Sequence, residues 1–600
     1  MKGHAIQVLL TTRSVDQLPF SQEGWWNVLS LSGLPNVECL SLIDALDIDH
    51  RLSDSIRCEI INKSGGVPFF IEETVKSSLL KGGKLESIPP TLMGALAMRL
   101  DMMGSLKYLV QALSVIGMEF SVSLVEQLAD FERDIHASLG KLIELGILQR
   151  KTNSDKAVVL EFSSGLMKDA AYQSLLLKKR KHLHQKVAKI LTEVKASVYP
   201  PAIPEVIAYH FQQGGLPERA IDFWIDAAKR ATQIYAYSDA SRYYELALDC
   251  LKGIDRKDKE DLRLNLLIAR GTNLMLKSGF ASREVGETFS QAYELCQKTK
   301  RVLPEVLYGL AVYLLTRGQY RKCSIIADRM IASSSRISDE EVAATGHRLM
   351  ALSSLCLGVL TEAKEHYYLL KVNDSPQFRK EVSIRFGGVD PYSSSIIFEA
   401  MVDWLEGRDP KESMQQALLE AGAFVSPSNH VYVLSVSCLI GMLQGDVDGV
   451  RKRAVKAMEL AEKHSFQLYL GWHQIMLGWA KCTSDSLGQG LRMMQKGIEF
   501  CNRTGALLFM PYWLAVFADI LLSAGASENA RKILDKSIHL ASTHEEKWCG
   551  TYLSLVRGKI ICEMEGREAA TKVWSEALEA AKTGKCIGFN AMLEKVLAES

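Results

Sequence analysis

From about residue 199 to the C-terminus, apolar positions recur at the three- and four-residue spacing of amphipathic helices. Within this region a small residue, a large aromatic residue and a second small residue recur at i, i+4 and i+7, in Ala220, Trp224 and Ala227, in Ala240, Tyr244 and Ala247, and in Ala570, Trp574 and Ala577. Small residues two turns apart let a neighbouring helix approach, and the aromatic ring fills the gap between them. The pattern predicts tetratricopeptide-like helix pairs that stack on one another. The alternative is an ordinary helical bundle with alanine-rich seams, since the period is irregular.

The preceding segment has a different pattern, which begins after the proline-rich break at 87–91. Three helical stretches are followed by two short β-like runs, 147–150 and 158–162, with the polar turn 152–155 between them. Three helices closed by a two-stranded wing are typical of a winged-helix domain.

Residues 1–88 alternate short β-like and helical stretches. The apolar run 6–10 is followed by Thr-Thr and Arg13, so that a cationic side chain is expected at the carboxyl edge of a parallel sheet, where such sheets receive ligands. A phosphate-binding loop does not follow, because the Gly-Lys pairs precede Leu, Leu, Ile and Cys instead of Ser or Thr, at Lys84, Lys141, Lys559 and Lys585. No nucleotide hydrolysis is expected from these residues alone.

Composition narrows the possible partners and chemistry. The formal net charge is +1, which gives no overall field for nucleic acid or an anionic membrane. The 12 cysteines include no C-x-x-C pair, so we expect neither a zinc site nor disulfides. Metalloprotease and hydrolase motifs are absent, and we therefore expect no catalytic residues. We interpret the sequence as cytoplasmic, since it has neither a signal peptide nor an apolar run long enough to span a bilayer.

Several ordered motifs carry a family resemblance: 11–13, 64–73, 88–92, 99–101, 170–176, 386–391, 478–480, 488–490 and 546–548. In their order and spacing, the chain resembles the C-terminal part of bacterial STAND-type (AAA-like) signalling ATPases, as found attached to class III adenylate/guanylate cyclase domains. The resemblance implies a mainly α protein with three parts. Residues 1–88 are expected to be the C-terminal remnant of the ATPase domain with its helical lid, residues 89–198 a winged-helix domain with a linker helix, and residues 199–600 tetratricopeptide-like repeats.

By this resemblance, three residues face a nucleotide. Arg13 is expected to act as a sensor near the terminal phosphate, although a surface arginine at a strand end is an alternative. Pro68 is expected to lie against the adenine ring, and it also suits the first turn of a helix. Ser164 stands where the family usually has a histidine that reaches the diphosphate, and a serine cannot carry the charge of an imidazolium. Whether nucleotide switching survives this replacement is left open by the sequence.

The resemblance also implies the partners. No cofactor is expected in this chain, and ATP or ADP with Mg is implied only for a complete parent protein that supplies upstream ATPase and cyclase domains. The repeats are expected to bind a protein or a small ligand and to gate an N-terminal effector. The basic run 178–186 is interpreted as a solvated helix face, so no nucleic-acid partner is expected, and no membrane partner either.

Two other functions are compatible with the same residues. One is the arm of a maltose-regulator-like transcriptional activator, although the C-terminal end is too short to hold the usual DNA-binding helix-turn-helix. The other is a truncated fragment that acts only as a protein-binding scaffold.

Overall fold

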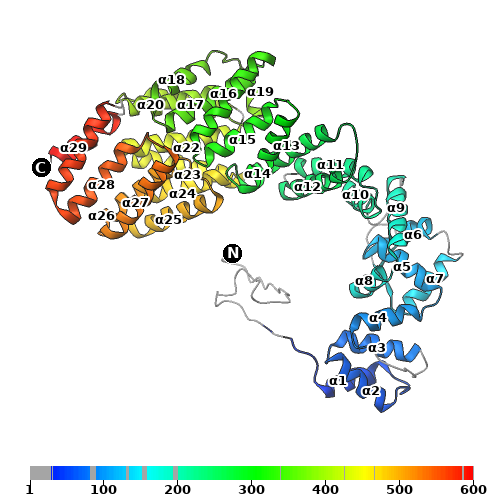
Figure 1. Cartoon of the computed structure of the whole chain (residues 1–600). Coiled ribbons are helices and arrows are strands. Elements are labelled where there is room, and N and C mark those ends of the chain that lie inside the picture. The colour runs from blue at the N-terminus through cyan, green and yellow to red at the C-terminus, as the bar shows by residue number, and fades with distance from the viewer. Residues whose placement is uncertain are drawn as a thin grey trace. The chain divides into compact units, whose positions relative to one another are not determined.

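A computed structural model of the chain describes residues 29, 31–80, 89–129, 134–151, 158–193, 201–234, 236–337, 339–424, 426–464, 466–484, 486–583 and 587–598. The described part is mainly α (Figure 1). It divides into two compact units, one of residues 1–202 with 213–215 and one of residues 203–212 with 216–600. The strand predicted before Arg13 and the turn predicted at 152–155 lie outside the described residues.

The first unit contains nine helices among its described residues: α1 (Asn36–Leu46), α2 (Asp54–Ser64), α3 (Pro68–Leu80), α4 (Leu92–Asp101), α5 (Leu106–Ile116), α6 (Val122–Leu128), α7 (Ile135–Glu144), α8 (Gly165–Gln173) and α9 (Leu177–Glu193). Helices α1, α2 and α3 pack on one another around a small apolar core that includes Ile43, Ile60 and Val75. Burial of this core stabilises a helical cluster, and α3 then packs against α4.

A small antiparallel sheet closes the helices α5 to α8. Its strands are β1 (Glu119–Ser121), β2 (Leu148–Lys151) and β3 (Val159–Phe162), in the order β1-β3-β2. Leu148 pairs with Phe162, and Glu119 pairs with Glu161. The two predicted β-like runs are thus strands, and β1 is a third strand that the sequence pattern did not indicate. It is only three residues long, which is too short for an alternating pattern to be recognised.

The second unit is an array of helices, whose described members are α10 (Pro204–Gln213), α11 (Pro217–Gln233), α12 (Tyr237–Lys252), α13 (Lys259–Ser278), α14 (Arg283–Lys298), α15 (Pro304–Thr316), α16 (Tyr320–Ile337), α17 (Glu340–Cys356), α18 (Leu360–Leu369), α19 (Pro376–Arg385), α20 (Pro391–Leu405), α21 (Lys411–Ala423), α22 (Pro427–Gln444), α23 (Val447–Lys463), α24 (Gln467–Cys482), α25 (Leu487–Thr504), α26 (Met510–Ser523), α27 (Ser527–His544), α28 (Gly550–Glu565), α29 (Arg567–Thr583), η2 (Ile587–Phe589) and α30 (Asn590–Ala598). Short loops join successive helices, which pack side by side in pairs. The prediction of helical repeats is confirmed.

The small-large-small pattern has the packing role that the sequence indicated. Ala570 and Ala577 are buried on α29, and the Trp574 ring between them donates a hydrogen bond of 3.1 Å from Nε1 to the Leu555 carbonyl on α28. A Cβ atom at Gly558 would overlap the same ring. The aromatic residue of one helix therefore occupies a space that its partner helix leaves by having no side chain.

Glycine also sets the distance between α24 and α25. A Cβ atom at Gly478 would lie 2.7 Å from the Gly490 carbonyl oxygen, and a Cβ atom at Gly490 would lie 2.5 Å from the Gly478 carbonyl oxygen. Because both distances are far below van der Waals contact, any larger residue at either position would push the two helices apart.

The array curves so that early helices meet late ones, along a line of contacts that we call the seam. The Thr316 carbonyl accepts hydrogen bonds from Leu507 N and Leu508 N at 2.8 and 3.2 Å, and the Cys356 carbonyl accepts one from Lys547 N at 2.8 Å. In Figure 1, the green helices of this unit accordingly lie beside its yellow and orange helices. The seam joins segments that are far apart in the sequence.

A buried carboxyl group lies at the centre of the seam. Tyr320 Oη donates to Glu546 Oε2 at 2.6 Å across 226 residues of sequence, and Trp548 Nε1 donates to Glu546 Oε1 at 2.7 Å. Glu546 is 3% exposed, and Tyr320 and Trp548 are fully buried. Burial raises the pKa of the Glu546 carboxyl to about 7, although both hydrogen bonds favour the ionised form.

This raised pKa predicts that the array becomes more stable as pH falls from 8 to 5. The carboxyl group binds its proton more tightly in the folded chain than in the unfolded chain, where its pKa is near 4.5, so the contribution is present at low pH and is lost as pH rises through about 7. The shift corresponds to about 3 kcal/mol at most. Urea unfolding at several pH values, with Glu546→Gln as the non-titrating control, measures it. Equal pH slopes for the two proteins would contradict the prediction.

Candidate functional site

Two of the three residues that the resemblance placed near a nucleotide lie in the described part of the chain. Pro68 is exposed at the start of α3, and Ser164 is the N-cap of α8, where its Oγ accepts a hydrogen bond of 3.5 Å from Met167 N. Arg13 lies outside the described residues. Helices α3 and α8 both pack against α4. Nucleotide contact by any of the three residues stays a prediction.

The turn before Pro68 has a structural role of its own. Gly65 and Gly66 both have positive φ, at 58° and 74°, which ends α2 and redirects the chain into α3. The Gly66 carbonyl accepts a hydrogen bond of 2.8 Å from Leu34 N, and a Cβ atom at Gly66 would overlap Leu34. The Gly-Gly-Val-Pro motif therefore has a structural reason to exist whether or not it meets a ligand.

A buried ion pair connects α3 with the helices that follow. Arg99 on α4 binds the Glu73 carboxylate on α3, and its Nη2 donates to the Leu145 carbonyl at the end of α7 at 2.5 Å. Both side chains of the pair are less than 5% exposed. Both residues belong to motifs of the family resemblance, but their spacing along the chain does not indicate that they form a pair.

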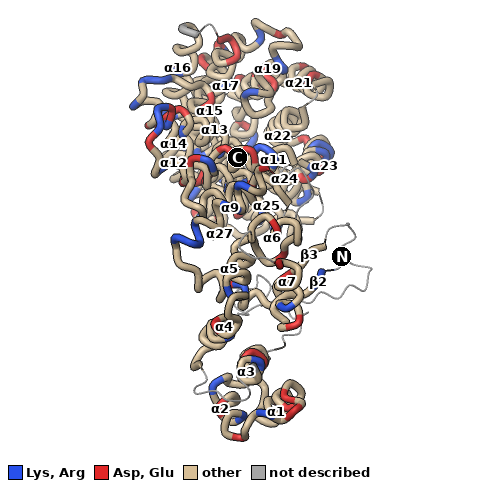
Figure 2. Tube along the Cα trace, turned by 90° about the vertical axis from the view of Figure 1, so that its right-hand side faces the viewer, with Lys and Arg blue, Asp and Glu red and all other residues tan. Residues whose placement is uncertain are grey.

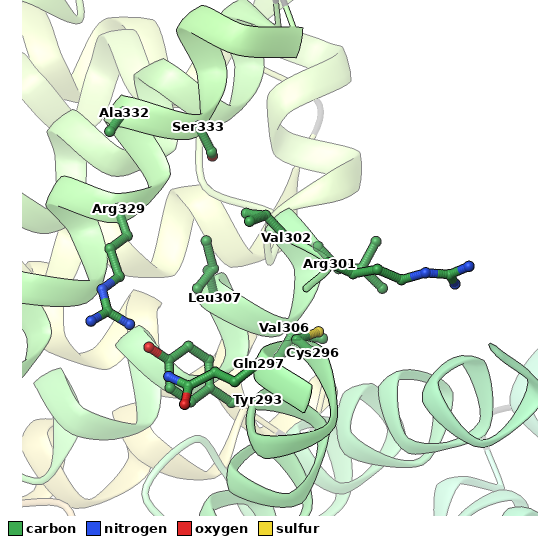
Figure 3. Close-up of a pocket in the computed structure, with 11 residues that line it drawn as sticks. Tyr293, Cys296, Gln297, Arg301, Val302, Val306, Leu307, Arg329, Ala332 and Ser333 are labelled. Atoms are coloured by element: carbon green, nitrogen blue, oxygen red, sulfur yellow. The ribbon is translucent and has the colours of Figure 1, made fainter. Parts of the chain in front are cut away.

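An apolar pocket lies among α14, α15 and α16, and we call it the α14–α16 pocket (Figure 3). Its volume is 230 Å³. Most of its wall is apolar, from Cys296, Val302, Leu303, Val306, Leu307 and Ala332. Val302 is 53% exposed at the edge of the pocket, whereas Val306 is fully buried at its base. An apolar group of a ligand would thus replace water at an already apolar surface.

One side of the α14–α16 pocket is polar. Figure 3 shows the Arg329 guanidinium directed toward Tyr293 and Gln297, while Arg301 points away. The guanidinium carbon of Arg329 lies 5.8 Å from the centre of the Tyr293 ring, and no carboxylate among the described residues pairs with it. Arg301 instead binds Asp261. The pocket thus combines apolar walls with one cation that is free to bind an anion.

A second pocket, of 380 Å³, lies near the C-terminus among α22, α24, α26, α28 and α30. Aromatic side chains from alternate helices and from η2 line it, namely Trp479, Tyr512, Tyr552 and Phe589. Two of its charged groups are paired, since Lys559 Nζ lies 2.9 Å from Asp519 Oδ1, and Tyr552 Oη donates to Asp519 Oδ2 at 3.3 Å. Lys595 also lines the pocket, and no carboxylate among the described residues pairs with it. This pocket therefore offers mainly aromatic packing area, with the exposed Lys595 as its one lining charge outside the Asp519–Lys559 pair.

Sequence reasoning did not find either pocket. The walls come from ordinary apolar positions on three or more helices, and each such position alone reads as part of the core. Trp479 is an example, because at 9% exposure it is nearly buried and it also lines the second pocket. The one signal in the α14–α16 pocket is Arg329, but an arginine on a polar helix face is not distinctive.

Two absences hold for the described residues. They contain no group of three or more His, Cys, Asp or Glu side chains placed to hold a metal ion. None of the described helices is both long and apolar enough to cross a membrane.

Comparison with known proteins does not assign the chain to a protein family. No protein-family model matches it. An uncharacterized protein of Rhizobium meliloti (strain 1021) is 24% identical over 497 residues, which cover 79% of this chain and 47% of that protein. The chain therefore spans about half the length of this curated relative.

Solved structures of helical-repeat proteins are also similar. The STAND protein with a tetratricopeptide repeat sensor from Pyrococcus horikoshii is 13% identical, with a TM-score of 0.38, over 95% of this chain and 75% of that chain. A Rap protein complexed with competence and sporulation factor is 10% identical, with a TM-score of 0.43, over 62% of this chain and 99% of that chain. Scores below 0.5 do not establish a common fold, so the repeat architecture rests on the helix packing described above.

The Glu73–Arg99 pair predicts an asymmetric result from mutation. Arg99→Met leaves the buried Glu73 carboxylate with only the partly exposed Lys76, 3.8 Å away, and is expected to lower the free energy of unfolding of the first unit by about 3 kcal/mol. The double variant Glu73→Met/Arg99→Met removes both charges and is expected to recover most of that loss. Chemical denaturation of the three proteins measures the effect. A double variant as unstable as Arg99→Met would show that packing, not charge, dominates here.

Proposed function

We propose that the chain is the regulatory half of a STAND-type signalling ATPase whose helical repeats sense a ligand and gate an upstream effector. The ordered motifs from 11–13 to 546–548 support the family assignment. By the same resemblance, the effector is a class III nucleotide cyclase, and the helices α5 to α8 with their small sheet form a winged helix that transmits the signal. The Rhizobium meliloti relative, of which this chain spans about half, has length for further domains.

The α14–α16 pocket is the observation that carries the sensing role. Its 230 Å³ volume, apolar base and single unpaired guanidinium suit a small molecule with an apolar body and one anionic group. A ligand that bridges α14, α15 and α16 would stabilise their present packing relative to any alternative. Sensing requires this difference in affinity between two arrangements.

The nucleotide would meet this chain at Arg13, Pro68 and Ser164. Pro68 is exposed, which suits contact with a flat base, and Ser164 has a hydroxyl proton to donate while its Oγ caps α8. ATP or ADP with Mg would also need a phosphate-binding loop from upstream residues. In this proposal, these three residues report on nucleotide state and take no part in bond breaking.

Straight-chain monocarboxylates test the sensing role. We expect octanoate to raise the melting temperature of the full chain, and octylamine not to, because Arg329 selects the anion. Arg329→Gln should remove most of the shift. Arg242→Gln is the matched control, since Arg242 also lies over a tyrosine ring, that of Tyr243, outside the pocket. An equal shift of the melting temperature in wild type and Arg329→Gln would contradict the proposal that the α14–α16 pocket binds the ligand.

Calorimetry with ATP and ADP tests the larger assignment. We expect the chain alone to bind neither nucleotide, and the chain joined to any coding sequence that precedes Met1 to bind at least one of them. If the extended protein binds neither, the nucleotide switch is absent. The chain would then act as a partner-binding scaffold, which is the alternative function.

A further inference from the structure

A third pocket, of 340 Å³, lies on the seam and is lined by three arginines. Arg317 follows α15, Arg503 is in the last turn of α25, and Arg283 is the first residue of α14. Hydroxyl and amide side chains complete the wall, from Ser278, Ser282, Asn502 and Thr504, together with Gly505. No acidic residue lines this pocket, although Lys and Arg positions alternate with Asp and Glu positions along most of the described helices (Figure 2).

Two of the three guanidinium groups have no counterion. Arg283 binds Glu287 at 2.6 Å, but no carboxylate among the described residues pairs with Arg317 or Arg503. Arg503 stacks on Phe500 with its guanidinium carbon 5.3 Å from the ring centre. The Nε atom of Arg317 is buried and has no hydrogen-bond partner among the described residues. A buried donor without a partner is costly, and an anion in the pocket would supply one.

Helix ends explain only part of this charge. The C-termini of α13, α15 and α25 lie at the pocket, and each carries a partial negative charge of about one half that an arginine offsets. The N-terminus of α14 lies there as well, and it carries a partial charge of the opposite sign. The pocket has three arginine charges, and Glu287 neutralises one of them. The other two exceed the partial negative charge of the helix ends, so the pocket keeps an excess of positive charge.

We propose that the seam pocket binds the phosphate group of a small molecule. Planar guanidinium groups match the oxygens of a phosphate in pairs, and the nearby hydroxyl and amide groups can donate further hydrogen bonds. A phosphate group offers more acceptor oxygens than a carboxylate and can bind both unpaired arginines at once. The ligand is either inorganic phosphate or a phosphorylated metabolite, and both offer the same chemistry to the pocket.

The position of the pocket gives the bound phosphate a structural effect. Gly505 packs directly against the Arg317 guanidinium and the Ala281 carbonyl, and the next residues, Leu507 and Leu508, form the seam hydrogen bonds with Thr316. An anion held jointly by Arg317 and Arg503 links the two sides of the seam and reduces the repulsion between them. Phosphate therefore tightens the closure of the array, and this effect does not depend on the α14–α16 pocket.

Calorimetry of the full chain with inorganic phosphate tests the proposal. We expect saturable one-site binding that weakens at least tenfold in Arg317→Gln and in Arg503→Gln, since each change removes a charged hydrogen-bond donor. Arg531→Gln is the matched control, because Arg531 is an exposed arginine paired with Glu528 outside the pocket. Arg503 is exposed, so its variant tests the site even if Arg317→Gln does not fold.

Two further measurements separate the possible outcomes. Glucose 6-phosphate that binds more tightly than inorganic phosphate identifies a metabolite as the ligand, whereas weaker binding identifies the free ion. Hydrogen exchange at the amides of Leu507 and Leu508 should slow severalfold on addition of phosphate in wild type and not in Arg503→Gln. Unchanged phosphate affinity in both arginine variants, or equal binding of acetate at the same ionic strength, would overturn the proposal.

Discussion

The hydrogen bond from Tyr320 to the buried Glu546 carboxyl fixes how the second unit closes on itself. A helical array is otherwise held only by contacts between neighbours, so that small differences in packing at each step accumulate along its length. The seam removes this freedom by joining the start of α16 to the loop after α27. A buried carboxyl group is expensive without partners, and it has two here, Tyr320 and Trp548, which leaves the closed arrangement as the one that satisfies it.

Closure also depends on how closely the helices of each pair approach. Gly478 faces Gly490 backbone to backbone, and Gly558 makes room for the Trp574 ring. Each of these glycines sets a helix separation, and the sum of such separations decides where Thr316 and Cys356 meet the late segments of the array. The seam hydrogen bonds are therefore a consequence of many short-range packing choices.

The pockets differ in their relation to this closure. The α14–α16 pocket is lined only by consecutive helices and the loop between them, with no residue from the late side of the seam. The seam pocket brings Arg317 and Arg503 together only when early and late helices meet. A ligand that binds arginines on both sides of the seam favours the closed array, whereas a ligand that binds consecutive helices mainly affects the local packing of those helices. The first arrangement couples a small anion to the conformation of the whole array.

The sequence by itself determined the local structure and its order along the chain. Apolar spacing fixed the helices, and the motif of Ala220, Trp224 and Ala227 identified residues that pack between helices, because such contacts involve near neighbours whose spacing is written in the chain. Two of the three strands could be found in the same way, and β1 could not because it is too short. The family resemblance supplied Arg13, Pro68 and Ser164, and their contact with a nucleotide stays a prediction.

Only the tertiary structure decided which distant residues meet. Glu546 and Trp548 were visible as a motif, but nothing in the chain indicates that Tyr320 lies against them, and Glu73 and Arg99 were likewise in motifs without any sign of their pairing. Arg329, Arg317 and Arg503 look like ordinary surface arginines in the sequence. What distinguishes them is that they line pockets and have no carboxylate partner among the described residues, and both depend on the side chains that folding brings within a few ångströms. The packing of many helix pairs together decides which of these side chains meet. The spacing of residues within one helix carries no information about it.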